Sequence, residues 1–393
     1  MVCGALINGT APAVTPAEQN ASSRDIVAHM RPFPAAAQDA LAALSTLGTA
    51  GRAAFAPGAA QALMTFIHNA CGEDSGWVLP ARNGAQGAAY VMKIKCPLQQ
   101  YIAFNFHPDI PDYAVFPASL RYSTCLDPAE MRRVYARIRL GPTGAQECVT
   151  GRIDGTEEIT PNPESGSYFC YTNSRTFLRG KLAGRDALFS CTEMTAPSAL
   201  SRRGIPVGSY EQALFYYSDK PGLNLSGMTW MLSRITRSTT LSVYVALSSN
   251  ETAVASFAWL KAGWKGLNLV RAPHILKSQK ATLDYSRRIA QHPGVSAESI
   301  AAIVASVRSL SGATVDADYE RYLAYVRSWR DDGKKSFFTQ RALLQELYDA
   351  GAAQVIPAPY RRALLVQERV RTLLGTPTWS APPAIAQHGL AAR

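Results

Sequence analysis

The chain has 393 residues, of which 47% are hydrophobic and 18% are charged, and its formal net charge is +11 at pH 7. This composition excludes a globally disordered chain and is sufficient for a large buried core, which at this length favours two or three domains. The longest apolar runs are shorter than the ~20 residues that a membrane-spanning helix needs, so we expect no transmembrane helix.

Residues 1–23 have the Ala-, Pro-, Thr- and Asn-rich composition of a flexible tether. Residues 1–13 lack the basic start and apolar centre of a signal peptide as they stand. Cys3, followed by Gly4, Ala5 and the tether, resembles the mature start of a bacterial lipoprotein. The resemblance implies a lipid anchor at Cys3; the alternative is a tail cysteine that is free or in a disulfide.

Residues 24–75 are expected to form two or three helices. Leu41, Leu44 and Leu47 lie on one face of the first, and Gly72 closes a second one over 59–70. Residues 76–274 change to a pattern of short β-favouring runs separated by turn clusters, which indicates an antiparallel β-rich domain. The runs that we expect to be strands are Tyr90–Lys95, Tyr101–Phe106, Ser119–Cys125, Arg133–Leu140, Ser167–Asn173, Thr176–Leu182, Ala187–Thr192 and Gln212–Tyr217.

The clearest strand pair lies near the end of this domain. Alternating apolar residues over Thr240–Leu247 and again over Ala253–Trp259 flank a polar turn of about four residues, and together they predict a β-hairpin. This ribbon carries almost no charge, so it would be prone to aggregation if left uncovered. We therefore expect it to lie at the centre of the sheet.

Residues 275–377 return to a helical period, with four or five helices, and residues 378–393 are expected to be a loose tail. Ser296 is placed to cap a helix whose apolar stripe contains Ile300, Val304 and Val307. Two more helices are expected over Phe338–Ala350 and Pro359–Leu374. The predicted fold class is α+β, with a large antiparallel sheet, sandwich-like or barrel-like, between an N-terminal helical segment and a C-terminal helical region.

The seven cysteines all lie in the first half of the chain. Six recur at intervals of about 21 to 29 residues, a spacing that fits successive hairpins, and they predict three disulfides of unknown connectivity. The candidates are Cys71, Cys96, Cys125, Cys148, Cys170 and Cys191. Disulfides would place the protein in the periplasm or outside the cell, whereas buried thiols would leave it in the cytoplasm.

Two segments carry candidate site residues. His107, Asp109 and Asp112 follow a predicted strand and could act as metal ligands or general bases, although a simple Pro/Asp turn explains them as well. Whether the protein is an enzyme is left open. The sequence contains no nucleotide-binding, serine-hydrolase or zinc-site spacing, so we expect no cofactor and no metal.

The second segment is basic and aromatic, and it follows the hairpin. Such a mixture of cations and rings suits an anionic polymer, a lipid surface or an acidic ligand, without a motif for specific DNA recognition. The alternative is an ordinary solvated helix face. The candidate ligand-binding residues are Trp264, Lys265, Arg271, His274, Lys277, Lys280, Arg287 and Arg288.

These patterns together favour a bacterial cell-envelope or secreted protein with a binding or structural role, whose basic-aromatic face meets an anionic partner. One alternative is a hydrolase whose carboxylates and histidines converge only in three dimensions. Another is an intracellular protein with reduced cysteines. The sequence leaves the ligand and the oligomeric state open.

Overall fold

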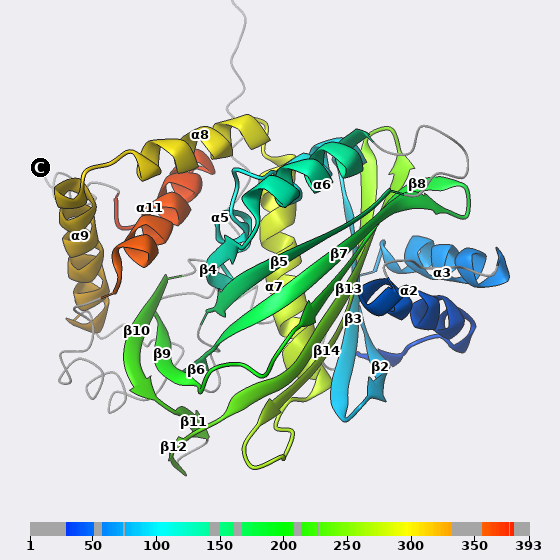
Figure 1. Cartoon of the computed structure of the whole chain (residues 1–393), viewed down its shortest axis with the longest axis horizontal. Helices are drawn as coiled ribbons and strands as arrows, with labels where there is room; N and C mark the ends of the chain where they lie inside the picture. The colour runs from blue at the N-terminus through cyan, green and yellow to red at the C-terminus, as the bar shows by residue number, and fades with distance from the viewer. Residues whose placement is uncertain are drawn as a thin grey trace, which may run out of the picture.

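The computed structural model describes residues 29–50, 57–73, 75–140, 149–160, 167–207, 214–225, 228–331, 356–376 and 378–380. A large twisted β-sheet crosses the molecule, and helices pack against both of its faces (Figure 1). This arrangement confirms the predicted α+β class. The division into separate domains stays a prediction.

The main sheet has nine strands, and only the first pair is parallel, so the sheet is mixed although almost entirely antiparallel. Its strands in spatial order are β1 (Arg31–Pro32), β2 (Gly76–Arg82), β3 (Ala85–Ile94), β14 (Glu251–Gly263), β13 (Arg234–Ser248), β8 (Arg185–Met194), β7 (Cys170–Leu182), β5 (Val149–Ile159) and β4 (Leu120–Cys125). The hairpin β13–β14 lies in the interior, with β3 on one side and β8 on the other. The expected central position of the hairpin is therefore confirmed.

Each face of this hairpin contributes to a different hydrophobic core. Leu241, Val243 and Val245 point to the face covered by α2 (Gln38–Ala50) and α3 (Pro57–Ala70). Tyr244 and Val254 belong to the core on the opposite face. The two-residue period thus separates two buried faces rather than one buried and one solvated face.

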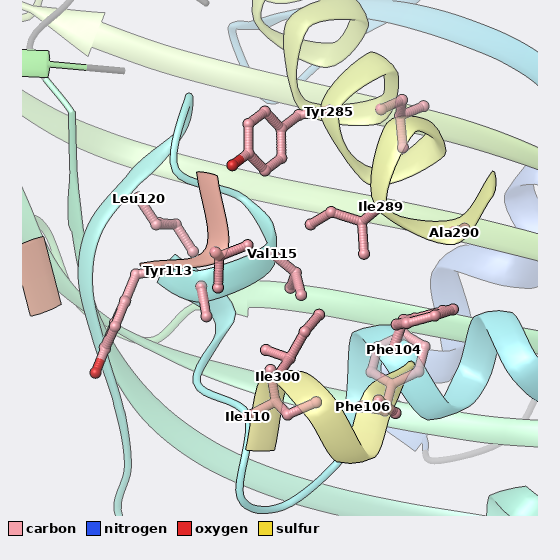
Figure 2. Close-up of a cluster of buried hydrophobic side chains, with 14 of the residues drawn as sticks. Phe104, Phe106, Ile110, Tyr113, Val115, Leu120, Tyr285, Ile289, Ala290 and Ile300 are labelled. Atoms are coloured by element: carbon pink, nitrogen blue, oxygen red, sulfur yellow. The ribbon is translucent and has the colours of Figure 1, made fainter. Parts of the chain in front are cut away.

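The larger core lies under the remaining helices. These are α4 (Leu98–Phe106), α5 (Asp112–Val115), α6 (Pro128–Leu140), α7 (Ala272–Gln291), α8 (Ala297–Arg308), α9 (Gly312–Asp331) and α11 (Ala358–Leu373). Figure 2 shows Tyr285 and Ile289 of α7 facing Val115 of α5, with Ile300 of α8 nearby. Ser296 caps α8 as predicted, since its hydroxyl accepts a hydrogen bond from the Ser299 backbone N–H.

Two small sheets complete the described residues. One contains β6 (Ser167–Tyr168), β9 (Arg202–Val207) and β10 (Leu214–Pro221), and the other pairs β11 (Leu223–Leu225) with β12 (Met228–Met231). A short 3-10 helix, η1 (Ala35–Ala37), precedes α2.

Two predicted strands are wrong. The run Tyr101–Phe106 lies in helix α4, and Arg133–Leu140 lies in helix α6. The buried residues of α6, Met131, Val134, Tyr135 and Ile138, have the spacing of a helical stripe, and the Asp127 carboxylate accepts a hydrogen bond from the Glu130 backbone N–H at its start. This segment therefore forms a helix because its buried residues have helical spacing, although its composition favours a strand. The helix expected over Phe338–Ala350 lies outside the described residues.

The expected framework of three disulfides is also wrong. Each of the five candidate cysteines within the described residues, Cys71, Cys96, Cys125, Cys170 and Cys191, carries a thiol that is not in a disulfide. The physical reason is their placement, because Cys96 belongs to the core on one face of the sheet and Cys191 to the core on the other. Regular spacing failed as a guide because helices alternate with hairpins in this part of the chain. Cys3 and Cys148 lie outside the described residues.

Candidate functional site

The basic-aromatic segment begins in the connection between β14 and α7. Trp264, Lys265 and Arg271 are exposed there, and Lys277 is exposed on the first half of α7. Arg288 lies 17 residues beyond Arg271, a separation of roughly 26 Å along a helix. The structure therefore brings only part of the predicted set together.

Other members of the set are used within α7 itself. The Asp284 carboxylate pairs with Lys280 at 3.0 Å and with Arg287 at 2.7 Å. His274 Nδ1 accepts a hydrogen bond from the Arg271 backbone N–H at the start of the helix. These side chains stabilise the helix. The exposed aromatic and basic side chains lie mainly in the connection before it.

That connection contains a tight turn over residues 264–267. The Leu267 N–H donates to the Trp264 carbonyl at 3.0 Å, and Lys265 and Gly266 between them have φ values of +46° and +84°. Positive φ at both central residues is the geometry of a type I′ turn. The turn presents Trp264 and Leu267 to solvent with exposed fractions of 37% and 62%, and Lys265 Nζ lies 4.8 Å from the centre of the Trp264 ring.

The base of the turn depends on Gly263. A Cβ at this position would lie 1.9 Å from the Leu267 carbonyl oxygen, so only glycine permits this close approach. Asn268 fastens the other side, because its Oδ1 accepts hydrogen bonds from the Ala262 and Val270 backbone N–H groups. The exposed aromatic and aliphatic side chains therefore project from an ordered support.

Neighbouring segments extend this surface. Arg234 lies opposite Gly263 in the β13–β14 ladder, and the Ser201 N–H donates to the Ser233 carbonyl at 2.9 Å. These contacts bring exposed Leu232 and Leu200 to the same end of the sheet. We call this surface the basic end; it comprises Leu200, Leu232, Arg234, Trp264, Lys265, Leu267 and Arg271. It holds four of the seven exposed large hydrophobic residues of the described chain.

A second polar group lies inside the molecule, where helix α5 meets strands β5 and β7. Arg175 donates from Nη2 to Asp112 at 2.8 Å and to Glu157 at 3.2 Å, and from Nε to the Thr192 hydroxyl at 3.1 Å. Tyr171 donates its hydroxyl proton to the other Glu157 oxygen at 2.8 Å. We call these residues the arginine–carboxylate cluster.

The electrostatics of this cluster are shaped by burial. Desolvation raises the pKa of Glu157, and the attraction of Arg175 only partly opposes it. The attraction of the Asp112 and Glu157 carboxylates raises the pKa of the Arg175 guanidinium, because it exceeds the opposing effect of desolvation. Burial and the neighbouring Glu157 raise the pKa of Tyr171 well above its usual value. Buried groups with displaced pKa values are candidates for chemistry, although structural ion pairs show the same property.

The other two predicted site residues are placed elsewhere. Asp109 pairs with Arg132 at the surface, with a separation of 3.2 Å, and its backbone N–H donates to His107 Nδ1 at 3.2 Å. The His107 ring lies 5.2 Å from the Tyr135 ring. Asp112 alone joins the arginine–carboxylate cluster. Sequence reasoning missed Arg175 and Glu157. Arg175 lies between two of the predicted strands and Glu157 lies in a segment of turn-like composition, so neither carried a readable signal.

Within the described residues, no group of three His, Cys, Asp or Glu side chains is arranged to hold a metal ion. None of the described helices is long and apolar enough to cross a bilayer alone. Helices α8 and α9 reach the required length and composition only together, across a bend of 108°.

No family model matches the chain, and no curated protein matches it. Among solved structures, an aromatase/cyclase from a Streptomyces species is 9% identical with a TM-score of 0.23, over 51% of this chain and 86% of that one. The lipid transfer and protein localization domain of human StarD13 is 7% identical with a TM-score of 0.24, over 58% and 91% of the two chains. Both scores are too low for either likeness to indicate a function.

Proposed function

We propose that this protein binds anionic membrane surfaces, and that the basic end is the surface that docks. The observation that carries the proposal is the turn over residues 264–267, which exposes Trp264 and Leu267 on either side of Lys265. A soluble surface gains nothing by exposing two large apolar side chains on a rigid turn, whereas the interfacial region of a bilayer accommodates both of them.

The charges of the basic end support an anionic surface. Lys265, Arg234 and Arg271 are all exposed, and each cation near an anionic bilayer contributes about 1 kcal/mol. Inserting an aromatic or aliphatic side chain contributes about 1.5–3 kcal/mol when its burial is complete. A soluble anionic polymer could use the cations and the Trp264 ring, but it offers no apolar surface for Leu200, Leu232 and Leu267, so these three exposed leucines favour a membrane over a polymer.

The test is co-sedimentation of the protein with lipid vesicles. We expect binding to vesicles that contain phosphatidylserine, weaker binding to phosphatidylcholine alone, and a loss of binding as salt screens the charges. Trp264→Ser combined with Leu267→Ser, and separately Arg234→Glu combined with Lys265→Glu, should each lower the vesicle affinity by about tenfold or more.

The matched control is Leu126→Ser, which removes a side chain of the same exposure as Leu267 but lies outside the basic end. It should leave vesicle binding unchanged. If the protein instead binds a soluble polyanion such as heparin and ignores vesicles, the lipid surface is the wrong partner. Equal loss of binding in the control variant would also count against the proposal.

A periplasmic or extracellular location, with a lipid anchor at Cys3, stays a prediction. The unbridged thiols remove the disulfide framework on which that location mainly rested. Docking of the basic end on a membrane requires neither that location nor the anchor.

A further inference from the structure

A groove of 620 Å³ lies between helix α3 and the segment that contains β1 and η1. It is on the face of the sheet that α2 and α3 cover, and its lining includes none of the residues of the basic end. Its volume falls in the range of sites that take drug-sized molecules.

Small side chains keep the groove open. Gly58 and Ala62 lie about one turn apart on α3, and Pro34 and Ala36 lie on the opposite wall. A Cβ at Gly58 would meet no atom within 4 Å. The space is therefore left by residue size, and a single larger residue on either wall would fill part of it.

The inner end of the groove is aromatic. Phe66 and Trp77 both line it and meet edge to face, with ring centroids 5.0 Å apart. Each is almost fully buried and therefore fixed in position. Only a small part of each ring reaches the groove, and that part can meet the ring of a flat aromatic partner, a contact worth about 0.5–1.5 kcal/mol beyond the burial of apolar area.

One cation stands at the same end. The Arg31 guanidinium lies 5.1 Å from the centre of the Trp77 ring and forms an ion pair with Glu73. The Arg31 and Glu73 side chains are 48% and 44% exposed, so their pairing is weak and an arriving anion can compete for Arg31. Arg31 is therefore placed to hold an anionic group over the aromatic floor.

We propose that this groove binds a flat aromatic molecule that carries one anionic group, with the ring against Phe66 and Trp77 and the anion at Arg31. The proposal does not depend on membrane docking, because the two sites share no residue.

The test uses anilinonaphthalene sulfonate, an aromatic sulfonate whose fluorescence reports its binding, with the stoichiometry measured by isothermal titration calorimetry. We expect one dominant site. Ala62→Phe should fill the groove and weaken binding by about tenfold or more. Arg31→Gln should weaken binding by about twofold to fivefold, because one exposed charge–charge contact is lost.

Controls separate this site from general dye binding. His68→Phe places a larger apolar ring at an exposed position of the same helix outside the groove and should leave the affinity unchanged. Ala36→Phe fills the groove from the opposite wall and replaces Ala62→Phe if that variant fails to fold. Unchanged affinity in the filled variants would overturn the site, and unchanged affinity in Arg31→Gln would overturn the assignment of an anionic group.

Discussion

Lys265 has a backbone conformation that its residue type does not favour. Its φ of +46° lies in the left-handed region, where a side chain with a Cβ costs about 1 kcal/mol or more. Asparagine tolerates this region better and is common at this position of a type I′ turn. The lysine therefore keeps a charge at the tip of the turn at some expense in stability.

Lys265→Asn should consequently have opposite effects on stability and binding. We expect the free energy of unfolding to rise by up to about 1 kcal/mol, because the strained backbone is relieved. The affinity for phosphatidylserine vesicles should fall by about fivefold, because one cation near the lipid surface is removed. Urea unfolding and vesicle co-sedimentation measure the two effects, and a variant that binds as well as the parent protein would contradict a role for this charge.

Glu157 provides a prediction about pH. Burial raises its pKa in the folded state above the unfolded value, so the folded state holds the proton more tightly. The stability that comes from this proton is present below the unfolded pKa and is lost as pH rises through the folded pKa. The contribution of Glu157 to the free energy of unfolding should therefore fall as pH rises through the weakly acidic range. An ordinary salt-bridged carboxylate has the opposite effect, because its contribution rises with pH.

Glu157→Gln should remove this dependence. The stability of the variant relative to the parent protein should be higher at pH 7 than at pH 4, because the neutral amide has no charge to desolvate. Asp154→Asn makes the same carboxylate-to-amide change at a half-exposed position of the same strand and is the matched control. Urea unfolding of the variant and the parent protein at the two pH values measures this difference in stability. If the stability of the variant relative to the parent falls between pH 4 and pH 7, burial does not raise the pKa of Glu157.

At the scale of elements, Arg121 of β4 connects three parts of the fold. Its Nη1 donates to Glu158 of β5 at 2.6 Å, and its guanidinium lies 3.6 Å from the centre of the Tyr217 ring on β10. The Tyr360 ring of α11 lies 4.5 Å away, and its hydroxyl donates to the same glutamate at 3.0 Å. The buried Arg121 side chain thus joins the main sheet, the three-stranded sheet that contains β10, and helix α11.

Arg121→Met should destabilise the protein by roughly 3–5 kcal/mol, because it leaves the Glu158 carboxylate buried without its counter-charge. Adding Glu158→Gln should recover part of the loss, since the amide has no charge to compensate. Chemical denaturation of the single and double variants gives the coupling energy. Additive losses in the double variant would show that the two side chains do not act as a pair.

The elements show which sequence signals were reliable. The hairpin, the Ser296 cap and the helix over Pro359–Leu374 were predictable because period, cap and turn signals agree there. The runs Tyr101–Phe106 and Arg133–Leu140 were predicted wrongly. Their aromatic and β-branched residues favour strands, whereas their buried residues have the spacing of a helix. The arginine–carboxylate cluster was unpredictable because Asp112 and Arg175 are 63 residues apart and meet only through the sheet.

At the scale of the whole molecule, both hydrophobic cores are built on the same sheet. The same central strand contributes Val243 to one core and Tyr244 to the other, so neither core is complete without the hairpin. The sequence suggested separate helical and β-rich domains because the period changes sharply along the chain. Such changes mark the type of element, and they do not show which elements share a core.

This sharing predicts a single cooperative unfolding transition. Leu44 of α2 and Ile300 of α8 are fully enclosed in the two different cores. Leu44→Ala and Ile300→Ala should each cost about 2–5 kcal/mol, and each should move the same calorimetric transition to lower temperature without splitting it. Leu126→Ala, at an exposed position, should shift it little. Two transitions, of which each variant moves only one, would instead show that the helices on the two faces unfold as separate domains.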